Sequence, residues 1–378
     1  MKIGLFTECY LPVVNGVVYC VENIRNTLKN DGHQVFTFAP SSNKNRAHES
    51  DVYTLKSFRL GKTGYFFTYG FNHEMQEAAS TCDVLHTHHP FAMARNALKI
   101  SKKYKIPLVF THHTQYYQYL PYIPKPFRGM AKRYLDGFLK KFCDNCTAII
   151  APSTGVKIII EGYGTITPVE VIHNGIELEK FEIANPPVPT VFQKLKKDYT
   201  VILFVGRIAR EKNIDFLISS FEVALKKYPK MYLMIVGDGP ALQKLKVESA
   251  KLKTEENIIF TGNVPRGKIQ NFYRAADVFA SASKTEVHPL VGLEAQASGL
   301  PIVSLKSVGY EDIILDGENG YFAEETHTDF ADKLVKLASN PQRQKEMSSK
   351  AIETSKEHSI EKSVEKMIKL YKSLIQFS

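Results

Sequence analysis

The sequence has no apolar run long enough to cross a membrane. No segment approaches the roughly eighteen consecutive apolar residues of a transmembrane helix, and near the N-terminus only four apolar or small residues separate Lys2 from Thr7. That run is too short for the apolar core of a signal peptide. We therefore expect that any membrane contact of this protein is at the membrane surface and does not cross the bilayer.

Cysteine is scarce: the chain has 5, and all lie within its first 146 residues. An odd number argues against a disulfide framework and favours a reducing cytosol. Cys143 and Cys146 form a CxxC pattern, but no second Cys or His pair follows at the spacing of a zinc site. We interpret them as ordinary thiols between a helix and a strand.

The familiar nucleotide-binding motifs are also missing. No GxGxxG follows a predicted strand, and although Gly61-Lys62-Thr63 looks like the end of a P-loop, Lys56 stands where its first glycine is required. There is no Asp-x-Asp pair to hold a divalent cation against a diphosphate. Lys, Arg and backbone amides must therefore hold any diphosphate that this protein binds.

The chain is long enough for two domains, because it has 378 residues and a domain takes roughly 150. Hydrophobic residues make up 44% and charged residues 23%, which is typical of a globular protein and excludes extended disorder or a coiled-coil rod. The formal net charge of +10 favours anionic partners such as phosphorylated ligands, nucleic acid or an acidic membrane surface.

Short apolar runs alternate with longer stretches of helical periodicity, which is typical of a parallel sheet covered by helices on both faces. We therefore predict an α/β protein with two doubly wound, Rossmann-like domains. The predicted strands are 2–6, 34–38, 84–86, 108–111, 148–151 and 169–172 in the first half, and 201–205, 232–236, 258–261, 278–280 and 302–304 in the second.

Three prolines in Asn185-Pro186-Pro187-Val188-Pro189 mark the best linker candidate, because proline continues neither a helix nor a central strand. We expect an N-terminal domain over 1–183, a linker over 184–198 and a C-terminal domain over 199–357. The last segment, 358–378, has apolar residues at helical spacing. It must bury that face, and the first domain is the candidate partner.

Ligands of open α/β sheets bind at the carboxyl ends of the strands, so the loops there are the first candidates for a site. Asn15 and Gly16 follow the first strand, where a glycine lets the backbone approach a ligand and helical amides can hold phosphate. The first strand of the second half is followed by Gly206, Arg207 and Lys212. Arg207, as a planar fork, and Lys212, as a point charge, could converge on one polyanion.

Two glutamates, Glu286 and Glu294, lie eight residues apart across a predicted strand-to-helix turn. Glu286 is expected in the loop and Glu294 about one turn inside the helix, so both could face one ligand. Their surroundings are largely apolar, which argues against a merely solvated pair.

Histidines gather at the ends of two predicted strands, with His86, His88 and His89 at one and His112 and His113 at the other. Both groups are expected to overlook the same ligand site. No Cys or carboxylate completes a familiar zinc spacing. We therefore expect no metal there, and favour polar contacts to a sugar hydroxyl or a phosphate.

These motifs, taken in order, resemble glycosyltransferase family 4, whose members are retaining enzymes of the GT-B fold. The resemblance spans nearly the whole chain and rests on Asn15-Gly16, Gly206-Arg207-x4-Lys212, Gly237-Asp238-Gly239-Pro240, and Glu286-x7-Glu294 with the segment that continues to Pro301. It implies two Rossmann-like domains with an interdomain cleft, and a nucleotide sugar bound mainly by the second domain.

The resemblance implies roles for the second domain. Arg207 and Lys212, following Gly206, grip the diphosphate, while Glu294 binds the ribose hydroxyls and Glu286 the donor sugar. Cations placed in this way stabilise the charge that builds up on the leaving diphosphate. No metal or other cofactor is then needed, and the family resemblance favours retention by same-face attack assisted by the leaving phosphate over a covalent intermediate.

The resemblance also implies roles for the first domain. The loop with Asn15 and Gly16 closes over the phosphates. His113, and not its neighbour His112, matches the family's active-site histidine.

One position departs from the family pattern. Relatives usually carry glycine after the first glutamate, whereas this chain reads Glu286-Val287-His288-Pro289. Proline has no N–H to offer a phosphate. We therefore expect the amides of Leu290 and Val291 to donate instead.

The segment 95–141 is strongly basic, with eleven Lys and Arg residues against a single acid, Asp136. Within it, apolar residues from Phe127 to Phe142 form a continuous stripe at helical spacing. A basic amphipathic helix can lie in an acidic membrane interface, each nearby cation adding about 1 kcal/mol. The alternative is that the stripe packs on its own sheet and the cations are only solvated. The candidate membrane-binding cations are Arg128, Lys132, Arg133, Lys140 and Lys141.

The basic helix and the preceding segment, 113–119, resemble the lipid-glycosylating members of the family. We therefore expect a hexosyltransferase that uses a nucleotide sugar of the UDP-glucose or GDP-mannose type and a membrane lipid acceptor, on the cytoplasmic face of the membrane. The alternatives are a transferase with soluble acceptors in capsule or lipopolysaccharide synthesis, a GT-B epimerase, and a basic nucleic-acid-binding protein. The last leaves the two spaced glutamates unexplained.

Overall fold

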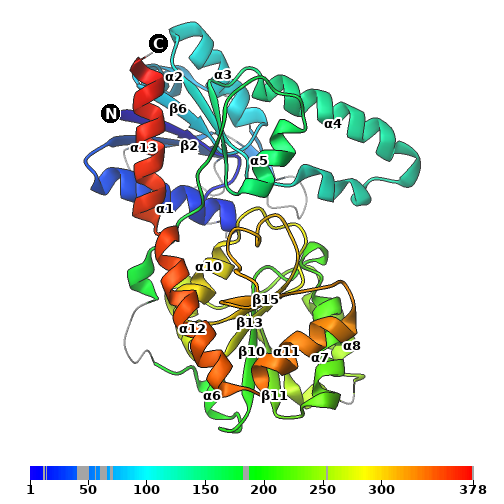
Figure 1. The fold of residues 1–378 in the computed structure, drawn as a ribbon. Coiled ribbons are helices and arrows are strands. Elements are labelled where there is room, and N and C mark those ends of the chain that lie inside the picture. Colours follow the sequence, from blue (N-terminus) through cyan, green and yellow to red (C-terminus); the bar gives the residue numbers. More distant parts are fainter. Residues whose placement is uncertain are drawn as a thin grey trace. The chain divides into compact units, whose positions relative to one another are not determined.

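The computed structural model describes residues 1–11, 13, 15–40, 51–55, 57–59, 66–68, 71–181, 187–252 and 254–376. The chain forms two compact units (Figure 1). Unit 1 comprises Met1–Gly175 and Ile360–Ser378, and unit 2 comprises Ile176–Ser359. Each unit has its own parallel sheet and its own covering helices.

The sheet of unit 1 has seven parallel strands in the order β3-β2-β1-β6-β7-β8-β9. All six strands predicted for this half are present. β3 was not predicted, because this edge strand mixes polar and apolar residues. The short antiparallel pair of β4 and β5 was not predicted either. The bounds are β1 Lys2–Phe6, β2 Gln34–Pro40, β3 Val52–Leu55, β4 Ser57–Arg59, β5 Phe66–Thr68, β6 Val84–Thr87, β7 Leu108–Thr111, β8 Ala148–Ala151 and β9 Val169–Val171.

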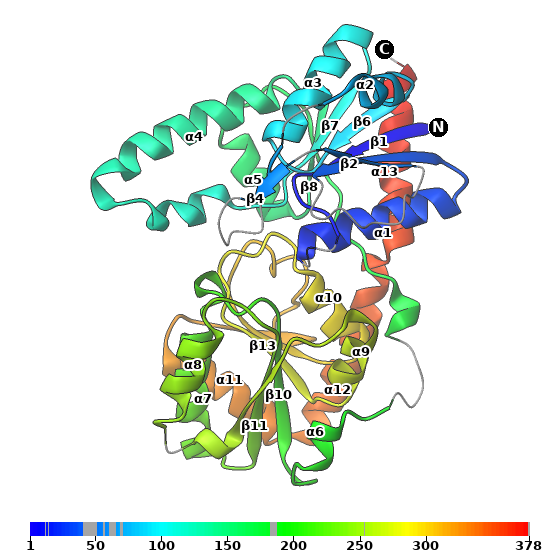
Figure 2. The ribbon, with the colours of Figure 1, turned by 180° about the vertical axis from the view of Figure 1, so that it is seen from behind.

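Helices cover this sheet, and the predicted C-terminal helix is one of them. The face of α13 with Ile360, Val364, Met367 and Tyr371 is buried, and the helix packs beside α1 (Figures 1 and 2). The predicted return of the chain end to the first domain is therefore confirmed. The bounds are α1 Gly16–Asn30, α2 His73–Ser80, α3 Ala92–Tyr104, α4 Arg128–Cys143, α5 Thr154–Glu161 and α13 Ile360–Gln376, with 3₁₀ turns η1 Tyr116–Tyr122 and η2 Lys125–Phe127.

Unit 2 has six parallel strands in the order β12-β11-β10-β13-β14-β15. The five predicted strands are present, and β15 was missed because it is short and begins with a glycine. The bounds are β10 Thr200–Val205, β11 Met231–Val236, β12 Ile258–Gly262, β13 Val278–Ser281, β14 Ile302–Leu305 and β15 Gly320–Ala323.

An apolar core lies between this sheet and its helices, with α7 packed against α11. The helices are α6 Thr190–Gln193, α7 Ile214–Lys227, α8 Leu242–Ser249, α9 Arg266–Arg274, α10 Leu290–Ala297, α11 His327–Ala338 and α12 Pro341–Ser355. The 3₁₀ turns are η3 Leu178–Lys180, η4 Arg210–Lys212, η5 Glu255–Asn257 and η6 Lys356–His358.

The unit boundaries fall at Gly175 and Ser359, where the sequence analysis expected 183 and 357. Of the expected linker, 184–186 lie outside the described residues, and α6 begins directly after Pro189. Lys56 and Gly61-Lys62-Thr63, the segment compared with a P-loop, also lie outside them. All five cysteines are free and buried; a lack of disulfides was the expectation from their odd number.

Both sheets reverse their strand order at one point. In unit 1 the chain runs outward from β1 to β3 and then crosses to β6 on the other side of β1; in unit 2 it does the same from β10 to β12 and then to β13. Ligands of doubly wound sheets bind outside the carboxyl ends of the strands at such a reversal. The loops after β1 and β6, and those after β10 and β13, are therefore the places to look for a site.

Candidate functional site

Unit 2 brings together the loops that follow β10 and β13. Lys212, the last residue of η4, donates from Nζ to Oε1 of Glu286 at 2.6 Å. The Lys212 side chain is 23% exposed and that of Glu286 12%, so the pair is shielded from bulk water and still reachable by a ligand. A second bond ties the loops together, because Nδ2 of Asn213 donates to the Ala282 carbonyl at 3.3 Å.

Arg207 lies on the same loop and forms an ion pair with Glu211. Burial raises the pKa of Glu211, but a backbone hydrogen bond and the charges of Arg207 and Lys212 outweigh it, so this pKa lies below its usual value. One carboxylate therefore interacts with both cations. The Arg207 side chain remains 45% exposed, which leaves its guanidinium accessible to an anion.

The loop after β11 supports the loop after β10 by close backbone packing. A Cβ at Gly237 would lie 1.9 Å from the carbonyl oxygen of Gly206, and Gly237 has a φ of +141°, a conformation that favours glycine. A Cβ at Gly239 would lie 2.3 Å from the carbonyl oxygen of Ile208. The Gly237-x-Gly239 motif is therefore a backbone support for the loop that carries the cations.

Glu294 lies in α10 and accepts a hydrogen bond from the Tyr273 hydroxyl at 2.9 Å. Burial raises the pKa of Glu294. The two spaced glutamates thus have different partners, and a shared ligand for them stays a prediction. A pocket of about 20 Å³, room for roughly one water molecule, reaches Glu294 and is also lined by Ile176, Glu177, Lys180, Phe181, Arg266, Ile269 and Gln270.

Helix α10 begins at Leu290, directly after Pro289. The Pro289 carbonyl accepts the Gly292 N–H at 3.1 Å. Leu290 and Val291 occupy the first two helical positions, whose N–H groups have no acceptor within a helix. Their expected contact with a phosphate stays a prediction.

In unit 1, Asn15 caps the first helix: its Oδ1 accepts the Val18 N–H at 2.9 Å. Its Nδ2 donates to Sγ of Cys9 at 3.5 Å. A Cβ at Gly16 would meet nothing within 4 Å, so packing within unit 1 does not require a glycine there. The space beside Gly16 is open to a ligand.

His113 follows β7 and is 8% exposed. Its Nε2 lies 3.0 Å from Nδ1 of His88, which follows the neighbouring strand β6. His112, by contrast, is fully buried, and its Nε2 bonds the Tyr163 hydroxyl at 3.0 Å. His86 is also fully buried, between the hydroxyls of Tyr371 and Thr111, each at 2.6 Å. His86 and His112 are therefore structural. His88 and His89 are 0% and 1% exposed, so the expectation that both histidine groups reach a ligand narrows to His113.

Glu8 is a buried carboxyl that the sequence analysis missed. It follows β1 at the strand-order reversal, and its Oε1 accepts the Met93 N–H at 2.6 Å. The Glu8 N–H donates to Nδ1 of His89 at 3.2 Å. Burial raises the pKa of Glu8 to about 7. The sequence could have indicated Glu8, because an acidic residue two positions after an apolar strand lies where such sheets bind ligands.

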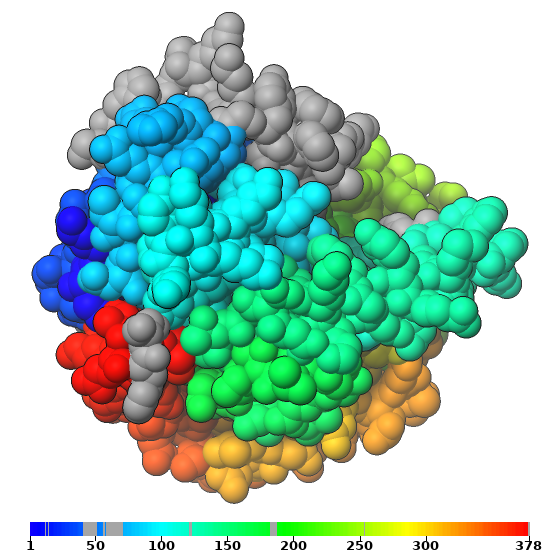
Figure 3. Space-filling view, turned by 90° about the horizontal axis from the view of Figure 1, so that it is seen from above, coloured from blue at the N-terminus to red at the C-terminus, as the bar shows by residue number. Residues whose placement is uncertain are grey.

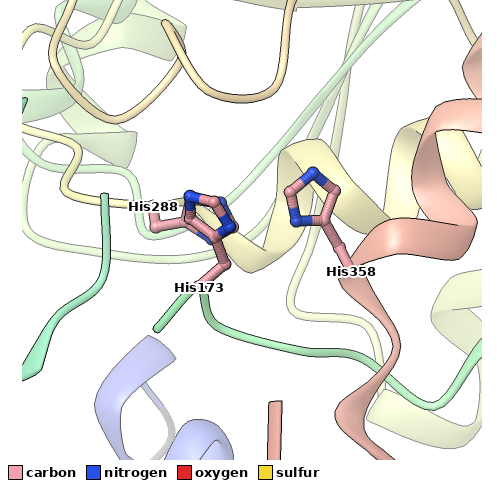
Figure 4. Close-up of side chains that lie close together, drawn as sticks. All are labelled: His173, His288 and His358. Carbon is pink, nitrogen blue, oxygen red and sulfur yellow. The ribbon is translucent and has the colours of Figure 1, made fainter. Parts of the chain in front are cut away.

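Two further histidines pair within unit 2. His288, in the loop after β13, and His358, in η6, have ring centroids 5.1 Å apart (Figure 4). The third histidine labelled there, His173, belongs to unit 1. The expectation that the protein uses no metal stays a prediction.

Helix α4 projects from the body of unit 1 (Figures 2 and 3). In its first half the apolar stripe is exposed, by 56% at Phe127, 68% at Met130 and 75% at Tyr134. At its end Leu139 and Phe142 are buried. The expectation of a stripe packed on the sheet therefore holds for the end of the helix. The start of the stripe is open to solvent, and between the two Ala131, Leu135 and Phe138 are half-buried.

Three of the five candidate membrane cations make contacts inside unit 1. Arg133 and Lys141 are exposed and have no ion pair among the residues that the structure describes. No helix in the described part of the chain is long and apolar enough to span a membrane. The contacts are Arg128 with the Ile123 carbonyl, Lys132 with Asp136, and Lys140 with Asp144.

Two family models match the chain. The one described as Glycosyltransferase Family 4 matches residues 14–180, and the one described as Glycosyl transferases group 1 matches residues 190–354. An alpha-monoglucosyldiacylglycerol synthase of Streptococcus pneumoniae is 32% identical over 86% of this chain and 76% of its own length. A protein of the same name from Acholeplasma laidlawii is 31% identical over 90% of this chain and 89% of its own length.

The structure is also similar to a solved one. HepE of Anabaena, in a complex with UDP, matches with a TM-score of 0.77 over 99% of this chain and 100% of that chain, at 18% identity. An identity this low shows a shared fold. The similarity therefore extends through both units, with their two doubly wound sheets.

Proposed function

The chain belongs to glycosyltransferase family 4 and is a hexosyltransferase of the GT-B fold, and we propose that it moves a hexose from a nucleotide-diphosphate sugar to a membrane lipid. The donor is of the UDP-glucose or GDP-mannose type. The observation that carries this proposal is the pair of cations, Arg207 and Lys212, at the strand-order reversal of unit 2, both held by carboxylates.

The two cations are the proposed site of the diphosphate. Arg207 and Lys212 are each paired with a carboxylate. Phosphate oxygens can take the place of these carboxylate oxygens while the two cations stay where they are. When the bond between the anomeric carbon and the diphosphate breaks, negative charge builds up on the leaving oxygen. Cations already in place stabilise that charge, and no metal is required for this step.

Glu294 and its pocket are the proposed site of the nucleoside. The half-buried Glu294 carboxylate accepts hydrogen bonds from two ribose hydroxyls, and the Tyr273 hydroxyl orients it. Glu286, which holds Lys212, contacts the donor sugar. The acceptor attacks the face from which the diphosphate leaves, so the configuration at the anomeric carbon is retained.

A lipid acceptor is supported by two independent facts. Two relatives that match most of this chain are named as synthases of monoglucosyldiacylglycerol. In addition, α4 presents an exposed apolar stripe beside the exposed cations Arg133 and Lys141, a combination that lies well in an acidic membrane interface. We propose that the protein binds the cytoplasmic face of the membrane peripherally, with diacylglycerol or a phosphoinositide as acceptor.

The reaction is tested with a panel of donors and acceptors. UDP-glucose, UDP-galactose and GDP-mannose are each combined with a lipid extract and with soluble saccharides, with and without EDTA, and products are identified by mass spectrometry. We expect one donor to give a glycolipid with retained anomeric configuration, in EDTA as well as without it. Transfer to soluble saccharides alone would overturn the lipid assignment, and loss of all transfer in EDTA would overturn metal independence.

Membrane binding is tested by flotation with vesicles of anionic lipid at low salt. Arg133→Glu combined with Tyr134→Ser is expected to reduce binding about tenfold or more, because it removes one cation and exposed apolar area together. The matched control is Lys246→Glu, a charge reversal at an exposed position of α8 in unit 2. Equal binding by both variants would contradict a role for α4.

A further inference from the structure

Two imidazoles of unit 1 form a buried pair whose protons can be assigned. Nδ1 of His88 and Nε2 of His113 lie 3.0 Å apart, and the two rings are stacked with centroids 5.2 Å apart. Burial lowers the pKa of both well below the usual value, so both rings are neutral. One proton therefore lies between the two nitrogens, and it belongs either to His88 or to His113.

The free nitrogen of His88 decides between the two arrangements. Nε2 of His88 is buried and has no hydrogen-bond partner among the described residues. If His113 donated, the His88 proton would sit on this nitrogen as a buried, unpaired N–H, which is destabilising because the donor has lost its bonds to water and gained none. If His88 donates from Nδ1, only a lone pair is left unfilled. Unpaired buried acceptors are better tolerated than unpaired buried donors.

The neighbouring histidine offers His88 no alternative partner. The His86 ring lies beside it, with centroids 4.2 Å apart, but both nitrogens of His86 are already bonded to the hydroxyls of Tyr371 and Thr111. Tyr371 lies on α13, so the returning C-terminal helix helps to hold this group in place. The hydrogen bond to His113 is therefore the one that the His88 ring forms with the described residues.

From this geometry we propose that His88 is a positioning residue that fixes the tautomer of His113. His88 donates its Nδ1–H to Nε2 of His113, and His113 therefore carries its own proton on Nδ1. This deepens the proposed function, on which it rests for the identity of the ligand. His113 presents a fixed N–H donor to an acceptor oxygen of the substrate, either a sugar hydroxyl or a phosphate oxygen, and does not act there as a base.

The tautomer is observable without any substrate. In protein labelled with ¹⁵N-histidine, long-range ¹H–¹⁵N NMR correlations distinguish a protonated Nδ1 from a protonated Nε2. We expect His113 of the unchanged protein to be protonated on Nδ1. A proton on Nε2 of His113 would overturn the proposal at once. This spectrum does not depend on transfer, so it separates failure of this inference from failure of the proposed function.

Variants of His88 then test the consequence. His88→Asn places an amide N–H near the position of Nδ1, and we expect it to keep the His113 tautomer. His88→Leu removes the donor, so we expect His113 to shift toward the Nε2–H form and kcat/KM to fall about tenfold to a hundredfold. If His88→Leu does not fold, His88→Gln, whose amide nitrogen lies nearer the position of Nε2, takes its place. An unchanged tautomer in the donor-less variant, or an equal loss of activity in His88→Asn, would contradict the positioning role.

Two probes distinguish the sources of the acceptor oxygen. UDP or GDP alone supplies phosphate oxygens, and the intact nucleotide sugar adds sugar hydroxyls. A shift of the His113 Nδ1–H signal with the nucleoside diphosphate assigns the contact to phosphate. A shift only with the nucleotide sugar assigns it to a hydroxyl, and no shift with either would refute contact with the donor.

Discussion

The two units share a doubly wound parallel sheet with the same reversal of strand order, but the side chains at the ends of their strands differ in kind. In unit 2 these ends carry cations paired with carboxylates. In unit 1 they carry buried histidines that burial keeps uncharged, namely His86, His88, His89, His112 and His113. The topology decides where a ligand can lie, and the residue types decide whether the site suits an anion or a hydroxyl.

The two units are expected to differ most in their stability at acidic pH. Burial lowers the pKa of His86 and His89 to about 3 and that of His112 to about 4, below the usual value of about 6.5. The stability that depends on these neutral rings is fully present above pH ~6.5 and is lost as the pH falls towards these values, by about 1 kcal/mol per ring at pH ~5.5. We expect unit 1 to open before unit 2.

Hydrogen exchange of the β6 and β7 peptides, compared with the β10 and β13 peptides between pH 7 and 4.5, measures this difference.

Glu8 changes the stability of unit 1 with pH in the opposite direction. Burial raises its pKa to about 7, so its contribution to stability is present at low pH and is lost as the pH rises through that value. One carboxyl does not offset five imidazoles. Simultaneous opening of both units, or earlier opening of unit 2, would refute the comparison.

The cations of unit 2 give the next largest effect. Arg207→Ala, Lys212→Ala and Glu286→Ala are each expected to lower kcat/KM about a hundredfold or more, the cost of removing one preorganised group at a developing charge, with little change in melting temperature. The control is Lys230→Ala, which breaks an exposed ion pair with Asp198 of 2.8 Å outside the proposed site. Near-normal rates in the three site variants would contradict the assignment.

The backbone support of the cation loop predicts a smaller effect, on stability. Gly237→Ala introduces a Cβ 1.9 Å from the Gly206 carbonyl oxygen, and we expect the free energy of unfolding of unit 2 to fall by about 2 kcal/mol. Gly267→Ala, where a Cβ meets nothing within 4 Å, is the control and is expected to stabilise its helix slightly. Denaturant titration measures both, and equal effects would show that the loop does not need its glycine.

The smallest effect is expected at the proposed nucleoside site. Tyr273→Phe removes the hydroxyl that donates to Glu294 at 2.9 Å, so we expect KM for the donor to rise roughly three- to tenfold while kcat changes little. Steady-state kinetics with varied donor concentration measures this. Tyr232→Phe, in β11, is the control. A fall in kcat at constant KM would show that Tyr273 acts on the reaction and not on nucleoside binding.

Much of this arrangement could be predicted from the sequence, because buried parallel strands are continuous apolar runs and motif residues follow them directly. Two strands that were not predicted, β3 and β15, lie at sheet edges. β3 mixes polar and apolar residues, and β15 is short and begins with a glycine. Pairings such as Lys212 with Glu286, or His88 with His113, join residues far apart in the chain. Sequence periodicity carries no information about such contacts, and only the fold reveals them.

The central claim, that Arg207 and Lys212 hold the diphosphate, is tested most directly by calorimetry in EDTA. Binding of UDP is compared with that of uridine, or of GDP with that of guanosine, in the unchanged protein and in Arg207→Ala/Lys212→Ala. We predict that the diphosphate strengthens binding in the unchanged protein, and that the double variant loses this gain while it binds the nucleoside equally well. A gain that survives the loss of both cations would contradict the account.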